Sequence, residues 1–399
     1  MTRDRPADLP PLDPETLAVH GGQFDEPSRC HVPPIHLSTV FRFESVAEMA
    51  AVFRGEQPGW IYSRYGSPTV ELVEGHMARL EGAPAALATA SGMSAIAAAL
   101  MGFMQAGDHL VAAADLYGGT RHLFDAIFSR LGIATDYFPV DEPARLEALC
   151  RPNTRAVYVE SPTNPTLRVI DLADAAARAR KLGLRTIVDN TFATPLLQRP
   201  LELGADLVIH SGTKALGGHD DVLAGFVVGE AGLVGAARDV MKTFGATLDP
   251  HAAWLLERGL KTLGVRVARQ CDNAEALAAW LNAHPAIARV HYPGLPGHPG
   301  HAVAARQMKR FGGLLAFELR DGAPAVERLF ARARLVRLAP TLGGPETIAL
   351  VPAVSSHIRL TPAERQSIGI ADGLVRLSCG LEHIDDLKAD LDAGLRGGA

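Results

Sequence analysis

Cysteine is scarce in this sequence, with four residues in a chain of 399. No two of them form a Cys-x-x-Cys pair, because they stand far apart as Cys30, Cys150, Cys271 and Cys379. A disulfide framework needs a denser set of cysteines, and a zinc knuckle needs close pairs. The scarcity excludes both as the basis of the fold, and we expect four reduced thiols in the core.

Excess positive charge and an apolar leader are also missing. The formal net charge is −5 and the isoelectric point about 6.3, which excludes the basic surface of proteins that bind nucleic acids or anionic membranes. The first eight residues carry acidic side chains and proline where a secretory signal is apolar, so we expect a cytoplasmic protein. With 47% hydrophobic and 21% charged residues, the composition is globular, and the length suits two or three domains.

Charge is absent altogether between residues 81 and 108, a length that satisfies a hydropathy window for a membrane span. The segment contains proline, glycine and hydroxyl side chains, so a buried strand, a tight turn at Ser91 and a core helix over about 93–104 fit better. Backbone N–H groups at such a helix start stabilise phosphate, which makes Gly92 and Met93 candidate donors. A turn of small residues that serves only close packing is the alternative.

Strands and helices alternate from this point on, which predicts an α/β fold with a mostly parallel sheet. Ligands of such sheets bind at the carboxyl ends of the strands, where Gly92, Tyr117, Glu160, Asp189 and Lys214 all fall. The apolar runs that predict the strands are Ala85–Thr89, His109–Ala113, Arg155–Val159, Arg185–Val188, Leu207–His210 and Ala224–Val228.

The pattern divides the chain into three parts. Residues 1–60 are rich in proline with little periodicity and predict an N-terminal arm. Residues 61–258 hold the alternating strands and predict a large domain that binds the ligand. Residues 259–399 begin with long helices, continue with strands at Leu314–Leu319 and Leu374–Ser378, and predict a smaller C-terminal α+β domain. No internal repeat or low-complexity segment is evident.

A lysine and an aspartate follow two of the predicted core strands. Lys214 and Asp189 together suit pyridoxal phosphate (PLP): the amine forms a Schiff base with the aldehyde, and the carboxylate keeps the pyridine nitrogen protonated. The hydroxyls of Ser211 and Thr213 lie close enough in sequence to reach the phosphate. A solvated lysine and an aspartate that forms a turn or caps a helix are the alternative.

Seven motifs stand in order along most of the chain. They are Tyr62–Thr69, Ala90–Met93, Asp115–Thr120, Glu160–Pro165, Asp189–Phe192, Ser211–Lys214 and Val375–Glu382. With these motifs the sequence resembles the Cys/Met-metabolism (trans-sulfuration) enzymes that use PLP. The group includes cystathionine γ-synthases and lyases, methionine γ-lyases and homoserine-ester sulfhydrylases. The resemblance implies the aspartate-aminotransferase-like fold (fold type I), and a homotetramer built from dimers.

The resemblance also implies how the cofactor is held. Lys214 matches the Schiff-base lysine and proton carrier, Asp189 the partner of the pyridine nitrogen, and Tyr117 the ring stacked on the cofactor. The residues that match phosphate ligands are Gly92, Met93, Ser211 and Thr213, with Tyr62 and Arg64 reaching over from the neighbouring subunit.

The substrate site follows from the same matches. Arg376 matches the arginine that binds the substrate carboxylate with both guanidinium nitrogens, and Asn164 and Thr341 are assigned beside it. Tyr62 or Tyr117 is the candidate general base that frees the substrate amine or the incoming thiol. The implied reaction is at the γ-carbon: replacement on an activated homoserine ester by a thiol, as in cystathionine γ-synthases, or elimination from cystathionine.

Four positions depart from the family pattern, and the first is Ser67, which replaces a common asparagine. Pro340 stands where many γ-synthases and γ-lyases have an acid for the distal amino group of cystathionine, although plant-type cystathionine γ-synthases also carry proline there. Gly119 replaces the reactive cysteine of methionine γ-lyases and argues against that branch. Asp220 replaces a common serine, and if it faces the site it adds a negative charge that favours a cationic substrate end.

Several alternatives stay open. Methionine γ-lyase and O-acetyl- or O-succinylhomoserine sulfhydrylase are the alternatives within the family, and a PLP-binding protein without turnover is the alternative outside catalysis. The filled catalytic positions oppose the last of these. A metal site is not expected, because His298 and His301 lack helical context and nearby cysteine or glutamate ligands.

Overall fold

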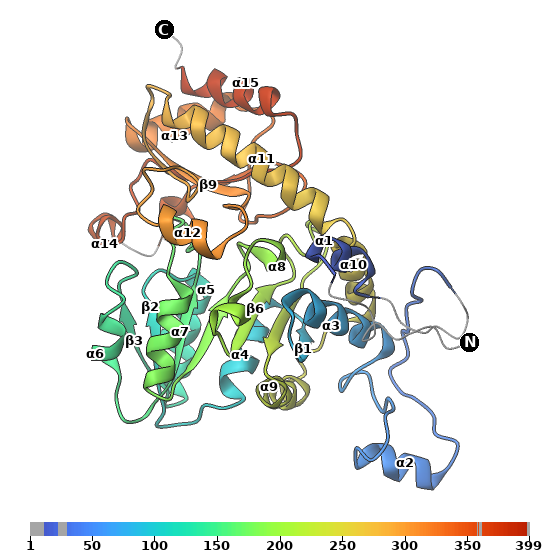
Figure 1. Ribbon diagram of the computed structural model, residues 1–399. Coiled ribbons are helices and arrows are strands. Elements are labelled where there is room, and N and C mark those ends of the chain that lie inside the picture. The colour runs from blue at the N-terminus through green and yellow to red at the C-terminus, as the bar shows by residue number, and fades with distance from the viewer. Residues whose placement is uncertain (1–11, 23–29, 357, 359–360, 397–399) are drawn as a thin grey trace.

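The computed structural model describes residues 12–22, 30–356, 358 and 361–396 (Figure 1). Seven strands form its larger sheet in the order β1-β7-β6-β5-β4-β2-β3. β7 runs antiparallel to both of its neighbours and the other six strands are parallel to one another, which confirms the mostly parallel sheet. The strands are β1 (Ala85–Thr89), β2 (His109–Ala113), β3 (Ala134–Phe138), β4 (Thr154–Glu160), β5 (Arg185–Asp189), β6 (Leu207–Ser211) and β7 (Gly225–Gly229).

Both faces of this sheet are buried, because successive side chains of a strand point to opposite faces. Leu87 and Val227 pack into one core, while their neighbours Ala86 and Phe226 pack into the other. The first core is closed by α4 (Gly92–Met101), α7 (Leu172–Lys181) and α9 (Ala231–Phe244). The second is closed by α1 (Pro14–His20), α3 (Pro68–Glu81), α8 (Thr194–Leu197) and α10 (Pro250–Leu260).

A smaller mixed sheet lies toward the C-terminal end of the chain, in the order β10-β11-β12-β9-β8 (Figure 1). Leu277, Phe317 and Leu391 are fully buried in the core between this sheet and its helices. The strands are β8 (Ile287–His291), β9 (Leu314–Leu319), β10 (Arg337–Leu338), β11 (Ile348–Leu350) and β12 (Leu374–Ser378). The helices are α11 (Leu263–Asn282), α13 (Gly322–Arg332) and α15 (Ile384–Leu395).

The helix expected over 93–104 is α4, and its start is fixed by a capping box. The Ser91 side chain accepts from the Ser94 N–H at 3.1 Å, and the Ser94 hydroxyl accepts from the Ser91 N–H at 3.0 Å. The remaining short elements are α2 (Val46–Phe53), α5 (Gly118–His122), η2 (Leu123–Phe128), α6 (Arg145–Leu149), η3 (Pro200–Leu203), α12 (His301–Gln307), η4 (Pro352–Val354) and α14 (Pro362–Ser367).

The predicted arm extends away from both sheets around α2 (Figure 1). Two segments of it, 1–11 and 23–29, lie outside the described residues. The first of them includes the eight residues behind the prediction of a cytoplasmic protein. Within the part of the chain that the structure describes, no helix has the length and apolarity to cross a membrane. Cys30 is exposed and Cys150 half-buried, so the predicted core position is correct only for Cys271 and Cys379.

Candidate active site

Strand register brings the predicted site residues to one edge of the larger sheet. Glu160 at the end of β4 pairs with Asp189 at the end of β5, and Asp189 pairs with Ile209 of β6. Ser211 ends β6, and Lys214 follows three residues later. Because these strands are parallel, their ends open on the same side, where α/β sheets bind ligands.

Asp189 is buried, with 9% of its surface exposed, and two donors hold its carboxylate. The Thr191 N–H donates to Oδ1 at 3.0 Å and the Tyr158 hydroxyl to Oδ2 at 3.3 Å. Burial raises the pKa of Asp189, and burial together with the Asp189 charge raises the pKa of Glu160 well above its usual range. Two acids buried side by side fit a cationic group such as a protonated pyridine nitrogen, which would offset their charge.

The turn between β1 and α4 has the shape of a phosphate cradle. A Cβ atom at Gly92 would lie 3.0 Å from Ser211 Cβ, so the lack of a side chain lets the start of α4 approach the end of β6. The first N–H groups of a helix have no partner within the helix and attract anions. The backbone of Gly92 and Met93 and the hydroxyl of Ser211 therefore fit the phosphate of PLP.

Thr213 lies in the same turn, but its hydroxyl is engaged with β7. It donates to the Ala224 carbonyl at 3.3 Å and accepts from the Ala224 N–H at 3.0 Å. A phosphate that accepted a hydrogen bond from Thr213 would replace only the longer of these two contacts. The position is thus compatible with the predicted phosphate contact, provided that the hydroxyl turns.

Lys214 points toward the loop between β10 and β11 of the smaller sheet. Its Nζ atom donates to Thr341 Oγ1 at 3.2 Å. Burial lowers the pKa of Lys214, the positive charge of Arg376 lowers it further, and the charge of Asp220 opposes both. A lysine with a lowered pKa is a better proton acceptor near neutral pH.

Arg376, in β12, is buried beside the same loop, with 3% of its surface exposed. Nη1 donates to Asn164 Oδ1 at 3.0 Å and Nη2 donates to the Thr341 carbonyl at 2.9 Å. Its Nε is buried without a hydrogen-bond partner among the described residues. Burial lowers the pKa of Arg376 to about 10, so the guanidinium stays charged at neutral pH. A buried cation with an unused donor fits a substrate carboxylate.

Tyr117 directly precedes α5, where its backbone is anchored and its ring is half-exposed. The Tyr117 N–H donates to Glu160 Oε2 at 2.9 Å, and 47% of the residue's surface is exposed. A Cβ atom at Gly119 would lie 2.5 Å from the Tyr117 ring atom Cε1. A side chain at 119 would therefore require the Tyr117 ring to shift from its position in this structure.

Tyr62 and Arg64 are not brought to Lys214 within one chain. Arg64 Nη1 donates to the Lys242 carbonyl at 2.6 Å, and its guanidinium lies 4.9 Å from the centre of the Tyr65 ring. Tyr62 bridges to Val40 in the extended arm. Their assignment to the site depends on a second subunit and stays a prediction.

Glu160, Thr191 and Asp220 are functional candidates that the predicted site residues did not include. Glu160 holds the Tyr117 backbone, and the Thr191 hydroxyl accepts from the Ser211 N–H at 2.9 Å. Both lie in quoted motifs at strand ends, a position that signals a role in the site. Asp220 contacts Thr341, which is 121 positions away, and only its departure from the family pattern marked it in the sequence.

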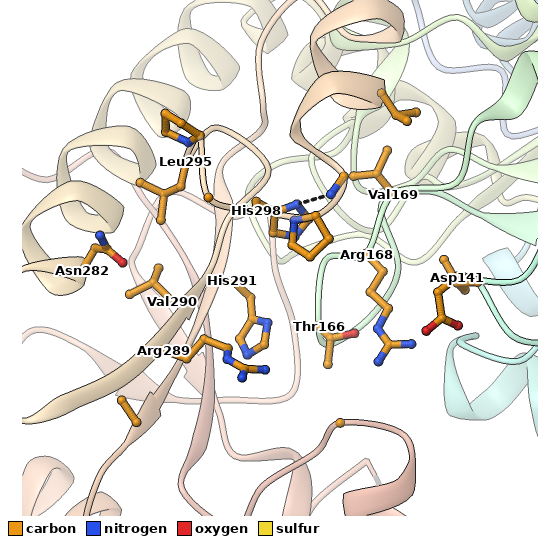
Figure 2. A pocket seen from close by; sticks show the side chains of 18 residues that line it. Asp141, Thr166, Arg168, Val169, Asn282, Arg289, Val290, His291, Leu295 and His298 are labelled. Atoms are coloured by element: carbon orange, nitrogen blue, oxygen red, sulfur yellow. Dashed lines mark hydrogen bonds between the residues drawn. The ribbon is translucent and has the colours of Figure 1, made fainter.

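A cavity of about 850 Å³ is lined by other residues (Figure 2). Arg168 and Asp141 line one side, and Arg289 and His291 line the other. Burial lowers the pKa of His298 to about 4, so its neutral ring accepts the Gly300 N–H through Nδ1 at 3.1 Å. Among the described residues, no three His, Cys, Asp or Glu side chains gather to hold a metal ion, and none of the predicted site residues lines this cavity.

The comparisons with known proteins agree with this geometry. The family described as Cys/Met metabolism PLP-dependent enzyme matches residues 15–396. O-succinylhomoserine sulfhydrylase of Pseudomonas aeruginosa is 44% identical, over 96% of this chain and 94% of that protein. L-methionine γ-lyase of Pseudomonas putida is also 44% identical, over 96% and 97%. The crystal structure of cystathionine γ-synthase from Xanthomonas oryzae pv. oryzae has a TM-score of 0.90 and 38% identity, covering 97% of this chain and 98% of that one.

Proposed function

Because this chain belongs to the Cys/Met-metabolism family of PLP-dependent enzymes, we propose that it catalyses γ-replacement, joining a thiol to the γ-carbon of an activated homoserine ester. The observation that carries the proposal is the buried Arg376 with its unused Nε, joined through Thr341 to Lys214. Thr341 thus bridges Arg376, which can bind a carboxylate, and Lys214, whose pKa is lowered. An α-amino acid substrate requires such a pair, because its carboxylate and its α-carbon are neighbours.

The family's cofactor would be held by the residues at the sheet edge. We assign Lys214 to its aldehyde, Asp189 to its pyridine nitrogen and Tyr117 to the face of its ring. The phosphate contacts would come from Gly92, Met93, Ser211 and Thr213. When bound, PLP withdraws electrons from the substrate's α-carbon, so that protons on the carbons beside it can be removed.

The chain's own residues then position the substrate and move protons. Arg376 and Asn164 hold the α-carboxylate, which fixes the α-carbon beside Lys214. Lys214 would take the α proton and return a proton near the γ-carbon. Thr341 accepts a hydrogen bond from Lys214 and orients the amine in this structure. Tyr117, or Tyr62 of a neighbouring subunit, is the candidate base for the substrate amine or the incoming thiol.

Replacement is favoured over the methionine γ-lyase reaction by one local feature. Relatives of both kinds are equally identical to this chain, so overall similarity does not separate them. Gly119 stands where methionine γ-lyases have a reactive cysteine, and a Cβ atom there would displace the Tyr117 ring from its position in this structure. The lack of that cysteine supports replacement.

The purified holoenzyme should turn over O-acetyl- or O-succinylhomoserine faster with cysteine or another thiol than without one. The assay measures the thioether product and the 2-oxoacid product in parallel, and O-phosphohomoserine, cystathionine and methionine serve as competing substrates. Faster formation of 2-oxoacid from methionine or cystathionine than of thioether from any ester would reject replacement as the main reaction.

The exposed arm supports assembly into a homotetramer of dimers. Leu37, Val40 and Phe53 are each at least 60% exposed in the single chain, and Trp60 and Tyr62 are also exposed. Apolar side chains gathered on one projecting segment mark a protein interaction surface. We propose that residues 1–60 form this arm, 61–258 the PLP-binding domain and 259–399 the C-terminal domain, in a cytoplasmic enzyme.

Mixing Arg64→Ala protein with Lys214→Ala protein should restore activity that neither variant has alone. In a hybrid dimer one site combines Lys214 of one chain with Arg64 of the other, so random exchange should recover about a quarter of the native sites. The control is a mixture of two Lys214→Ala preparations with different affinity tags, which shows subunit exchange without recovery. Complete exchange with no gain in turnover would mean that each chain builds its own site.

A further inference from the structure

Asp220 lies on the loop between β6 and β7, within reach of the proposed active site. The Thr341 hydroxyl donates to Asp220 Oδ1 at 3.3 Å, and the same hydroxyl accepts from Lys214 Nζ at 3.2 Å. The Thr341 carbonyl accepts from Arg376. One residue thus joins the lysine, the carboxylate-binding arginine and an aspartate.

The backbone holds this carboxylate in place at some cost. Asp220 has a φ of 59°, a left-handed conformation that few residues other than glycine adopt, although aspartate and asparagine tolerate it. A Cβ atom at Gly344 would overlap the Asp220 carboxylate, so the loop after Thr341 leaves room for it. Two separate segments therefore accommodate an exposed negative charge at the edge of the site.

We propose that Asp220 is a specificity-determining residue, which selects substrates whose far end is cationic or neutral and disfavours an anionic far end. The inference rests on the proposed function, because it takes the α-carboxylate to be bound at Arg376. With that end fixed, the substrate side chain extends past Lys214 toward Thr341 and Asp220. Pro340, which is exposed and uncharged beside Thr341, adds no charge of its own. Asp220, on the loop between β6 and β7, thus supplies the negative charge that the sequence lacks at position 340.

The charge preference implies a choice among homoserine esters. An O-succinyl or O-phospho group places a negative charge at the end of the side chain, whereas an O-acetyl group is neutral. A thioether product with a distal ammonium group gains an attraction to Asp220. The substrate class that fits the site is therefore a neutral homoserine ester, with a thiol that carries an amino group.

The test uses three amino acids of similar length that do not depend on γ-chemistry: L-lysine, L-norleucine and L-2-aminoadipate. Their dissociation constants for the holoenzyme are measured by calorimetry at neutral pH, for the native protein and for Asp220→Asn, which tolerates the same backbone conformation. We expect the native enzyme to bind lysine most tightly and aminoadipate most weakly. In Asp220→Asn, the lysine constant should rise and the aminoadipate constant fall by roughly twofold to fivefold each, with norleucine unchanged, the size of a partly exposed charge pair.

Asp221→Asn is the matched control, since it removes the same charge from the adjacent exposed residue and should leave all three constants unchanged. Equal shifts for all three ligands in Asp220→Asn, no shift at all, or the same shifts in Asp221→Asn would overturn the inference. Turnover of O-acetylhomoserine with a thiol is measured separately on the native enzyme. Charge-selective binding without that turnover would reject the proposed reaction and leave the role of Asp220 intact.

Discussion

The kcat of Lys214→Ala protein is expected to fall by about 10²-fold to 10⁴-fold or more. This is the contribution of one positioned proton-transfer group. The reason is that, in the proposed site, Lys214 alone both attaches the cofactor and transfers protons. Borohydride reduction of the native holoenzyme followed by peptide mapping should place the pyridoxyl group on Lys214, beside Ser211 and Thr213.

Lys181→Ala is the matched control for this variant, because Lys181 is exposed at the end of α7, before the amino end of β5, whereas the residues assigned on the larger sheet lie at the carboxyl ends of its strands. It should retain native turnover and the native pattern of labelling. A pyridoxyl group on any lysine other than 214, or near-native kcat in Lys214→Ala, would contradict the assignment of Lys214 as the residue that attaches the cofactor.

Arg376→Ala protein should lose about 2–5 kcal/mol of transition-state stabilisation, roughly thirty-fold to several-thousand-fold in kcat/KM. Removing the guanidinium leaves the substrate carboxylate without its charge-assisted partner, and it also frees Asn164 Oδ1 and the Thr341 carbonyl. Arg376→Lys should recover only part of the loss, because an ammonium group cannot make the paired contacts of the planar guanidinium.

Arg289→Ala serves as the control, since Arg289 lines the separate cavity, which none of the predicted site residues lines (Figure 2). Its kcat/KM should stay within the range of the native enzyme. The thermal unfolding midpoint of each variant shows whether a loss is local. Near-native kcat/KM in a folded Arg376→Ala enzyme would overturn the carboxylate-binding role.

The sequence was most informative where strands are buried on both faces. Runs such as Leu207–Ile209 are apolar throughout, because neither face meets water, and all six predicted runs coincide with strands to within one residue at each end. The strand β3 was not predicted. It lies at the edge of the sheet, and only Phe138 in it is fully buried, so Thr135 and Asp136 broke the apolar pattern.

The site shows the same division between local and distant information. That Asp189 and Lys214 lie at the same edge of the sheet could be predicted, because Asp189 ends β5, Lys214 follows β6 by three residues, and parallel strands bring such ends together. The link from Lys214 through Thr341 to Arg376 could not be predicted. Lys214 and Thr341 are 127 positions apart, Thr341 and Arg376 are 35 positions apart, and the link connects the two sheets. Distances of this kind are set by how the sheets pack, which residue patterns along a single segment do not record.

The reversed direction of β7 has an evolutionary meaning. A parallel connection would carry the chain from β6 to the opposite edge of the sheet, but an antiparallel neighbour lets it return at the same edge. The segment between β6 and β7 therefore starts at Lys214's side of the sheet and ends there, with Asp220 at its turn. With the proposed role of Asp220, mutations in this return loop would change which substrates are accepted while the lysine and the sheet beneath it keep their places, so new specificities would arise here without rebuilding the catalytic centre.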